Sequence, residues 1–210
     1  MSEGPIRRHW SLAPLTLLYR IVTGIRNKLF EWKILPSEEF DIPIISVGNL
    51  TVGGTGKTPH TEYLIKLLKD KHKVALLSRG YKRKTKGFQL ATTDSTAKEI
   101  GDEPYQIKKK FPDIHVAVDA DRRHGIHQLC ESTATENTEV ILLDDAFQHR
   151  YVTPGINIVL MDYNRPIYED TLMPTGMLRE PASSLYRAHV IITTKCPKDM
   201  KQIEYGLLKK

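Results

Sequence analysis

Apolar residues along the chain gather in short runs, and these runs alternate with segments that have a helical period. Six runs predict buried strands, at residues 42–47, 73–78, 114–118, 140–143, 156–161 and 190–194. Between them, apolar spacing fits helices at 62–68, at 105–111 and in the segment that ends near Cys130. Because strands and helices alternate, the pattern predicts an α/β fold with a mainly parallel sheet flanked by helices.

The start of the chain has a helical period throughout. Its apolar residues recur every three or four positions and predict one helix over about residues 14–34: Leu15, Leu18, Val22, Ile25, Leu29 and Trp32, with Trp10, Leu12, Tyr19 and Phe30 widening the stripe. We therefore divide the chain into an amphipathic segment, 1–36, and a core domain, 37–210.

Charge supports an interfacial role for this first segment. The chain carries a net charge of +6, and residues 1–36 hold six arginines and lysines against two glutamates, a balance of +4. A basic amphipathic helix with tryptophan and tyrosine is typical of the headgroup layer of an anionic membrane. The alternative is a helix that packs on the domain and leaves its basic face in water. The concentration of charge favours the membrane.

Composition excludes several classes of protein. With 210 residues, 40% of them hydrophobic and 27% charged, the chain is long enough for one globular core. Its two cysteines, Cys130 and Cys196, lack metal-ligand spacing and indicate a reducing compartment. We identify no signal peptide and no bilayer-spanning run. Nucleic-acid binding has little support, because the basic residues do not interleave with exposed aromatic residues in a known module.

A glycine-rich loop separates the first predicted strand from the helix at 62–68. Its order of strand, glycines, Gly-Lys-Thr and helix is that of the phosphate-binding loop of nucleoside triphosphatases. Glycines let successive N–H groups face one concavity, and the helix adds the positive end of its dipole. Lysine then reaches the β- and γ-phosphates and threonine binds Mg²⁺. The predicted nucleotide-binding residues are Thr51, Val52, Gly53, Gly54, Thr55, Gly56, Lys57 and Thr58.

Two acidic pairs are candidates for the chemistry. Asp144 and Asp145 end an apolar strand, where such a pair holds Mg²⁺ opposite the phosphate loop. Asp102 and Glu103 precede Pro104 at the start of a predicted helix. Asp102 as an N-cap explains that position structurally. Adjacent carboxylates near a triphosphate also suit a Mg²⁺ site or a general base.

Polar residues after other strands are candidate substrate contacts. Gln148 and His149 follow the Asp144–Asp145 pair and are expected at the same crevice. Arg79 follows the second strand, Arg122 stands at a strand-to-helix junction, and Arg179 lies in a long connection. Loops that follow parallel strands line the ligand crevice, so these residues could meet anionic groups. The lysine-rich stretch 82–86 is interpreted as a solvated loop.

Five stretches, in order, resemble the tetraacyldisaccharide 4′-kinase family. They are 47–59 with Thr51 where phosphate loops usually have glycine, 78–81 (Ser-Arg-Gly-Tyr), 101–104 (Gly-Asp-Glu-Pro), 144–149 (Asp-Asp-Ala-Phe-Gln-His) and 178–181 (Leu-Arg-Glu-Pro). The amphipathic start also matches. The resemblance implies transfer of the γ-phosphate of ATP to the 4′-hydroxyl of a lipid disaccharide 1-phosphate in lipid A synthesis. It also implies dependence on Mg²⁺ and a peripheral location on the cytoplasmic face of the bacterial inner membrane.

The resemblance assigns roles to the candidate residues. It implies Asp102 as general base, Mg²⁺ near Thr58, Glu103 and Asp144, assistance at the transferred phosphate from Lys57, Asp145, Gln148 and His149, and anion binding by Arg79, Arg122 and Arg179. Ala146 replaces a glycine common in the family, a change that we expect to be tolerated. Family members continue past the position of Lys210 into a second lobe with a histidine that pairs with the catalytic aspartate. We therefore expect this chain to lack that histidine.

Two other functions remain open from the residues alone. One is a phosphate-loop kinase or ligase with a soluble substrate, for which we expect no binding to lipid vesicles. The other is a nucleotide-binding switch that recognises guanine through Thr193, Thr194 and Lys195. Pro197 stands where such an element has an aspartate. Preference for ATP over GTP separates the switch from the kinases.

Overall fold

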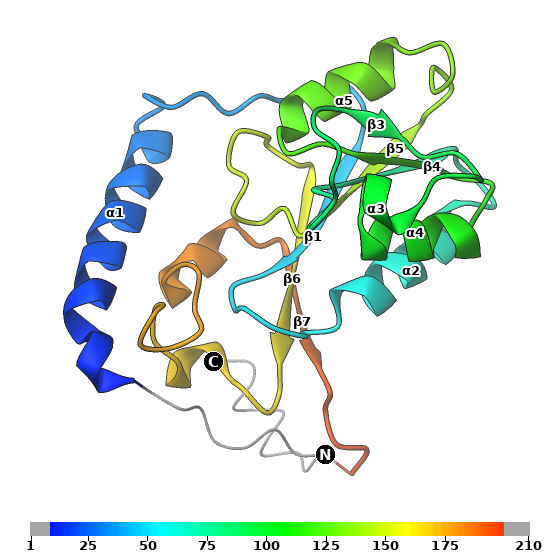
Figure 1. Ribbon diagram of the computed structural model, residues 1–210. Coiled ribbons are helices and arrows are strands. Elements are labelled where there is room, and N and C mark those ends of the chain that lie inside the picture. Colours follow the sequence, from blue (N-terminus) through cyan, green and yellow to red (C-terminus); the bar gives the residue numbers. More distant parts are fainter. Residues whose placement is uncertain (1–8, 200–210) are drawn as a thin grey trace.

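A seven-stranded sheet forms the centre of the computed structural model, which describes residues 9–199 (Figure 1). Its strand order is β3-β4-β2-β5-β1-β6-β7. The strands are β1 (Ile44–Asn49), β2 (Val74–Ser78), β3 (Gln89–Leu90), β4 (His115–Val118), β5 (Val140–Asp144), β6 (Ile156–Asp162) and β7 (Val190–Thr194). Every neighbouring pair is parallel except β3 and β4. The prediction of a mainly parallel α/β sheet is confirmed, while β3, only two residues long, has no periodicity that the sequence could reveal.

Helices connect the strands and cover the sheet. The α-helices are α1 (Ala13–Glu31), α2 (Lys57–Leu68), α3 (Ala97–Ile100), α4 (Asp102–Lys110) and α5 (Arg122–Glu131), and short 3₁₀ helices are η1 (Trp10–Leu12), η2 (Ile167–Glu169) and η3 (Ala182–Arg187). No helix between residues 9 and 199 is both long and apolar enough to cross a membrane.

The prediction that Asp102 caps α4 is wrong. Gly101 is the N-cap and Asp102 is the first helical residue. Gly101 has φ +92, and a Cβ there would lie 3.0 Å from the Tyr81 carbonyl oxygen. This left-handed, crowded position between α3 and α4 favours glycine over aspartate. The carboxylate of Asp102 is therefore not used as a cap and stays exposed at the helix start.

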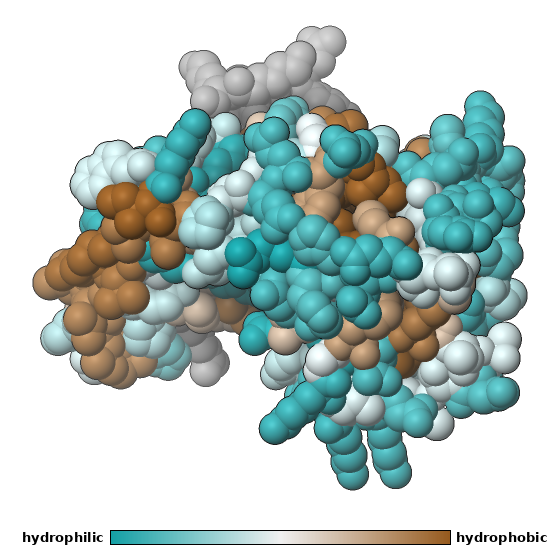
Figure 2. Space-filling view, turned by 90° about the horizontal axis from the view of Figure 1, so that it is seen from above, coloured by the Kyte–Doolittle hydropathy of each residue, from teal (hydrophilic) through white to brown (hydrophobic). Residues whose placement is uncertain are grey.

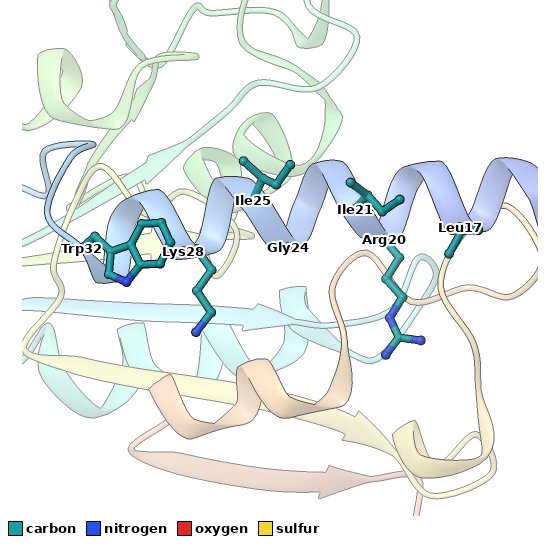
Figure 3. Close-up of a pocket in the computed structure, with 7 residues that line it drawn as sticks. All are labelled: Leu17, Arg20, Ile21, Gly24, Ile25, Lys28 and Trp32. Atoms are coloured by element: carbon teal, nitrogen blue, oxygen red, sulfur yellow. The ribbon is translucent and has the colours of Figure 1, made fainter.

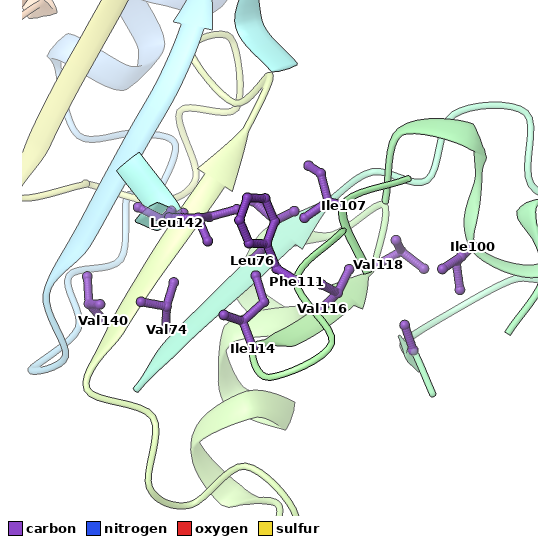
Figure 4. Packing of buried hydrophobic residues seen from close by; sticks show 12 residues of the cluster. Val74, Leu76, Ile100, Ile107, Phe111, Ile114, Val116, Val118, Val140 and Leu142 are labelled. Carbon is purple, nitrogen blue, oxygen red and sulfur yellow. The ribbon is translucent and has the colours of Figure 1, made fainter. Parts of the chain in front are cut away.

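Side chains of the central strands alternate between two hydrophobic clusters. On β2, Val74 and Leu76 face the cluster under α2, α3 and α4, which also contains Leu142 (Figure 4). Ala75 and Leu77 face the opposite cluster with α5. Leu76 and Leu142 are fully buried, and each such side chain contributes about 1.5–3 kcal/mol from its burial. The two clusters pack on opposite faces of the sheet and hold the strands in place. The candidate site lies at the ends of these strands.

Helix α1 lies beside this domain rather than within it (blue in Figure 1). Only Asn27 and Phe30 of its nineteen residues are buried. The ring of Phe30 meets the ring of Tyr151 edge-on, with centroids 5.0 Å apart. Burial in the core therefore does not explain why the other positions of the predicted stripe are apolar.

Candidate active site

The phosphate loop runs from the end of β1 to the start of α2, as the sequence predicts. Gly53 and Gly56 have φ values of +117 and +86, which L side chains rarely adopt. Asn49 at the end of β1 donates from Nδ2 to Thr55 Oγ1 at 2.8 Å. The backbone N–H of Val52 donates to the carbonyl oxygen of Met177 at 2.8 Å. The loop is thus held from β1 on one side and from the long connection after β6 on the other.

Opposite charges meet in front of this loop. Lys57 Nζ lies 3.6 Å from Asp145 Oδ1, and Arg179 Nη1 donates to both oxygens of Asp145 at 2.9 and 3.0 Å. The same Arg179 nitrogen is 3.3 Å from Gln148 Oε1. Strands β1 and β5 are neighbours, so their carboxyl ends bring Lys57 and Asp145 together. Two cations thus share the single carboxylate of Asp145 in front of the loop.

The second aspartate of the pair, Asp144, is almost completely buried. Burial raises its pKa to about 6, and the carboxylates of Glu103 and Asp145 add to the rise. Its Oδ2 accepts a hydrogen bond of 3.4 Å from Ser78 Oγ, whereas Oδ1 has no partner among the described residues. A buried carboxylate oxygen without a donor is costly unless a ligand satisfies it.

The candidate residues line one cavity of about 970 Å³. Its walls include most of the predicted site: Val52, Gly53, Lys57, Arg79, Asp102, Glu103, Arg122, Asp144, Asp145, Gln148, His149 and Arg179. Thr51, Gly54, Thr55, Gly56 and Thr58 are not among its lining residues. Thr51 and Thr55 are buried within the loop, and Thr58 is half-buried in the first turn of α2. The roles assigned to all of these residues stay predictions.

The position of Arg122 in the sequence fits either an anion-binding residue or a surface charge, and the structure excludes the surface charge because the side chain is buried. Its guanidinium is buried and donates to the carbonyl oxygens of Asp119, at 2.6 Å, and Asp144, at 3.1 Å. Burial lowers its pKa to about 10, so it remains charged at neutral pH. Arg122 thereby links the end of β4 to the end of β5, whereas Arg79 is exposed at the cavity wall.

His149 lies in the same wall as a neutral imidazole. Burial lowers its pKa to about 4, and the charge of Arg122 contributes to the shift. Its Nε2 is 4.0 Å from Asp121 Oδ1, and its ring lies 5.7 Å from the ring of Tyr151. At pH 7 this side chain can therefore donate one hydrogen bond to a phosphate but supplies no positive charge.

Sequence reasoning missed one wall of the cavity. Tyr19, Thr23 and Arg26 of α1 line it. Their spacing of four and three residues places them on one helical face. In the sequence, Tyr19 belongs to the predicted apolar stripe and Arg26 to the six basic residues of the first segment. The spacing of these three polar side chains is visible in the sequence, but only the structure shows that this face of α1 turns toward the cavity.

A phosphate loop after β1 and an acidic pair at the end of the adjacent β5 define a nucleotide-binding protein of the P-loop class. The model of the tetraacyldisaccharide-1-P 4′-kinase family matches residues 8–207. The chain belongs to this family.

Two curated relatives align with the whole chain. It is 62% identical over 210 residues to a tetraacyldisaccharide 4′-kinase of Phocaeicola vulgatus and 59% identical to that of Bacteroides fragilis, covering 57% and 56% of those proteins. It also matches the crystal structure of LpxK from Aquifex aeolicus, solved in complex with ATP, with a TM-score of 0.81 and 40% identity. That match covers 88% of this chain and 58% of the other. The chain thus spans little more than half the length of these relatives.

The residues present fit a magnesium ion with part of its ligands supplied by phosphate. Asp144 offers its unpartnered buried oxygen, and Glu103 lies close enough to raise its pKa. Between residues 9 and 199, no group of three or more His, Cys, Asp or Glu side chains could hold a metal ion alone. Proteins bind Mg²⁺ through one or two carboxylates together with substrate phosphates and water, and Asp144 and Glu103 are carboxylates that line the cavity.

Proposed function

We propose that the chain carries the catalytic core of a kinase that transfers the γ-phosphate of ATP to the 4′-hydroxyl of tetraacyldisaccharide 1-phosphate, forming lipid IVA. One observation carries this proposal: a single cavity joins the phosphate loop, both acidic pairs and the polar face of α1. Membership of the family supplies the reaction and the acceptor. The ATP complex of the Aquifex aeolicus relative supports the donor.

The phosphate loop and the residues before it would bind the triphosphate. The glycine backbone of residues 53–56 offers N–H groups at the N-terminus of α2. Lys57, now 3.6 Å from Asp145, would exchange that partner for the β- and γ-phosphates. Thr58, Glu103 and Asp144 would hold Mg²⁺. The ion, when bound, neutralises developing charge on the phosphate oxygens.

Transfer of the phosphoryl group needs a base and correct positioning. Asp102 would accept the proton of the 4′-hydroxyl. The hydroxyl oxygen would form a bond to the γ-phosphorus while the bond between this phosphorus and the β-phosphate oxygen breaks, which releases ADP. Lys57, Arg179 and Gln148 surround the Asp145 side of the cavity and would fix the transferred group. Positioning and charge stabilisation of this kind supply most of the catalysis in phosphoryl transfer.

The N-terminal segment would bring this core to its lipid. Apolar side chains of α1 point away from the domain (left in Figure 2), and Leu17, Ile21 and Ile25 are all about half exposed or more. These three residues line a mainly apolar surface pocket. The other residues that line it are Arg20, Gly24, Lys28 and Trp32 (Figure 3). Apolar side chains next to basic ones fit an anionic lipid surface.

We therefore assign residues 1–36 to the membrane interface and residues 37–210 to the kinase core. Tyr19, Thr23 and Arg26 face the cavity, while Leu17, Ile21 and Ile25 of the same helix are exposed to solvent. A lipid whose acyl chains stay in the bilayer would reach the site along this helix. The expected location is peripheral, on the cytoplasmic face of the inner membrane, where ATP is available.

The decisive test is lipid phosphorylation by the purified 210-residue chain. Labelled ATP, Mg²⁺ and tetraacyldisaccharide 1-phosphate in detergent micelles are incubated with wild type, Lys57→Ala and a matched control, Lys66→Ala, which removes an exposed lysine of the same helix. We expect labelled lipid from wild type and control, and a loss of at least about 100-fold in Lys57→Ala.

Two other results would change the proposal. ATP binding without transfer would limit this chain to nucleotide binding and assign transfer to the longer relatives. A preference for GTP, or no binding of either nucleotide by the folded chain, would overturn the assignment of the phosphate loop.

A further inference from the structure

A buried carboxylate in the wall of the cavity, with no role assigned to it above, contacts two arginines from distant parts of the chain. Glu180 is 1% exposed. Its Oε2 accepts a hydrogen bond from Arg187 of η3. Its Oε1 accepts no hydrogen bond among the described residues and forms an ion pair with Arg26 Nη1 of α1 at 3.7 Å. An almost fully buried glutamate is rare unless it is paired. Here it is paired twice.

Each arginine also holds the backbone of the segment that follows β5. Arg187 Nη1 donates to the carbonyl oxygen of Phe147 at 3.0 Å, and Arg26 Nη2 donates to the carbonyl oxygen of Gln148 at 2.8 Å. Two consecutive carbonyls are thus bound by two guanidinium groups that share one carboxylate. Arg187 additionally lies over the Phe147 ring, 4.2 Å from its centroid.

This segment carries residues of the proposed site and needs external support. Asp145 has φ +48, a conformation that non-glycine residues keep only when their surroundings impose it. Gln148 donates from Nε2 to the carbonyl oxygen of Asn49 at 2.8 Å and so connects the segment to the end of β1. A shift of the Phe147–Gln148 backbone would therefore move both Asp145 and Gln148 relative to the phosphate loop.

We propose that Glu180 is a positioning residue: through Arg26 and Arg187 it fixes the carbonyls of Phe147 and Gln148, and so sets Asp145 and Gln148 for phosphoryl transfer. The inference rests on the proposed kinase function for its kinetic consequences. Without the carboxylate, the two arginines have like charges in a poorly solvated place and separate. Arg187 is largely buried, whereas Arg26, on the cavity side, is free to turn toward solvent.

The test compares wild type with Glu180→Gln, which keeps the size of the side chain and removes its charge. Hydrogen exchange is measured on a peptide that contains the His149 amide, which donates to the carbonyl oxygen of Ala146 at 2.8 Å. We expect exchange there to accelerate by about 10-fold or more, corresponding to about 1.4 kcal/mol of lost protection. Exchange in β2, at the far side of β5, should not change.

Kinetics separates positioning from a general loss of structure. In the lipid kinase assay, we expect kcat of Glu180→Gln to fall by about 10- to 100-fold, as small misplacements do, with KM for ATP within about twofold of wild type. Glu62→Gln is the matched control, since Glu62 is a mostly buried carboxylate paired with Lys110 on another side of the domain. It should leave both kinetic constants and the His149 exchange unchanged.

Arg26→Gln provides a second variant that does not leave a buried charge unpaired in the core. It should reproduce part of the kcat loss, and the double variant with Glu180→Gln should lose less than the product of the single losses, because both act on one segment. Unchanged exchange at His149 in folded Glu180→Gln would overturn the proposal. Multiplicative effects would overturn it as well. Absence of activity in wild type would instead refute the proposed function, and the exchange experiment would still decide the role of Glu180.

Discussion

Helix α1 and the central strands are both rich in apolar residues, yet they use them in opposite ways. All residues of β2 and β5 are buried. In α1, only Asn27 and Phe30 are buried among nineteen residues, and the side chain of Val22 is 57% exposed. The apolar side chains of the strands form the hydrophobic core of the domain. The helix leaves most of its own on the surface.

The attachment of α1 to the domain is mainly polar. Tyr19 Oη donates to the carbonyl oxygen of Arg179 at 2.7 Å, and Thr16 Oγ1 is 2.5 Å from Thr175 Oγ1. Arg150 Nη1 donates to the carbonyl oxygen of Asn27 at 3.0 Å. An ordinary surface helix turns its apolar face inward and its polar face to water. Here the polar face points to the protein, so the apolar face is available for another surface.

The largest effect should come from the strands. Leu142→Ala removes a fully buried side chain and should lower the free energy of unfolding by about 2–5 kcal/mol. Leu17→Ala, the same change on the outer face of α1, should cost less than about 0.5 kcal/mol. Urea denaturation followed by circular dichroism measures both. Equal losses would mean that α1 belongs to the core after all.

Membrane binding should show the reverse. The triple variant Leu17→Ser, Ile21→Ser and Ile25→Ser should bind vesicles containing anionic lipid about 100-fold more weakly, with at least about 1 kcal/mol lost per side chain. Co-sedimentation with vesicles measures it, and unfolding should stay within about 0.5 kcal/mol of wild type.

A matched pair on α2 controls this experiment. Tyr63 and Leu67 are 59% and 54% exposed and lie outside α1. Their replacement by serine should leave binding to vesicles unchanged. An equal loss in this control would show unspecific adhesion, and no loss in the triple variant would remove the membrane interface from α1.

A smaller effect is expected at Asp144, where the buried strand meets the site. Its pKa is raised from 3.8 to about 6 in the fold, so ionisation lowers stability progressively as the pH rises between these two values, and the full loss is present above pH 6. Asp144→Asn should stabilise the nucleotide-free protein by about 1–3 kcal/mol at pH 7.5. The gain should decrease to about half at pH 5, because the folded carboxyl is then mostly protonated while its unfolded counterpart is ionised. Thermal unfolding at both pH values measures it.

The same variant should lose Mg²⁺-dependent binding of ATP, which isothermal titration measures. Asp119→Asn is unsuitable as a control because Asp119 pairs with His124, but Asp41→Asn changes an exposed carboxylate that does not line the cavity. It should neither stabilise the protein nor weaken ATP binding. Destabilisation by Asp144→Asn would show that the carboxylate is satisfied within the protein and would argue against a ligand there.

Local patterns predicted most of this architecture. Apolar runs predicted six strands, and the order around Lys57 predicted the phosphate loop, because both depend on residues close in sequence. Glycine geometry around Gly101 was misjudged, since the crowding that excludes aspartate comes from Tyr81. The pairing of Glu180 with Arg26 also depends on a contact between residues far apart in the chain. Such pairings have no signature in a single sequence.

The orientation of α1 shows the same limit. Periodicity established an amphipathic helix, but which face meets the protein was decided by partners at Thr175, Arg179 and Gln148. These residues lie in loops far along the chain. The outward direction of the apolar face therefore required the structure, even though charge had already favoured a membrane.

The smallest effect tests the polar attachment itself. Tyr19→Phe removes the hydroxyl that donates to the Arg179 carbonyl and should cost about 0.5–1.5 kcal/mol. Hydrogen exchange across α1 should accelerate while exchange in β2 and β5 stays the same. Tyr63→Phe, at an exposed tyrosine of α2, should change neither. If Tyr19→Phe leaves α1 as protected as before, the helix is held by Phe30 and Tyr151 rather than by its polar face, and the contrast with the strands becomes one of degree.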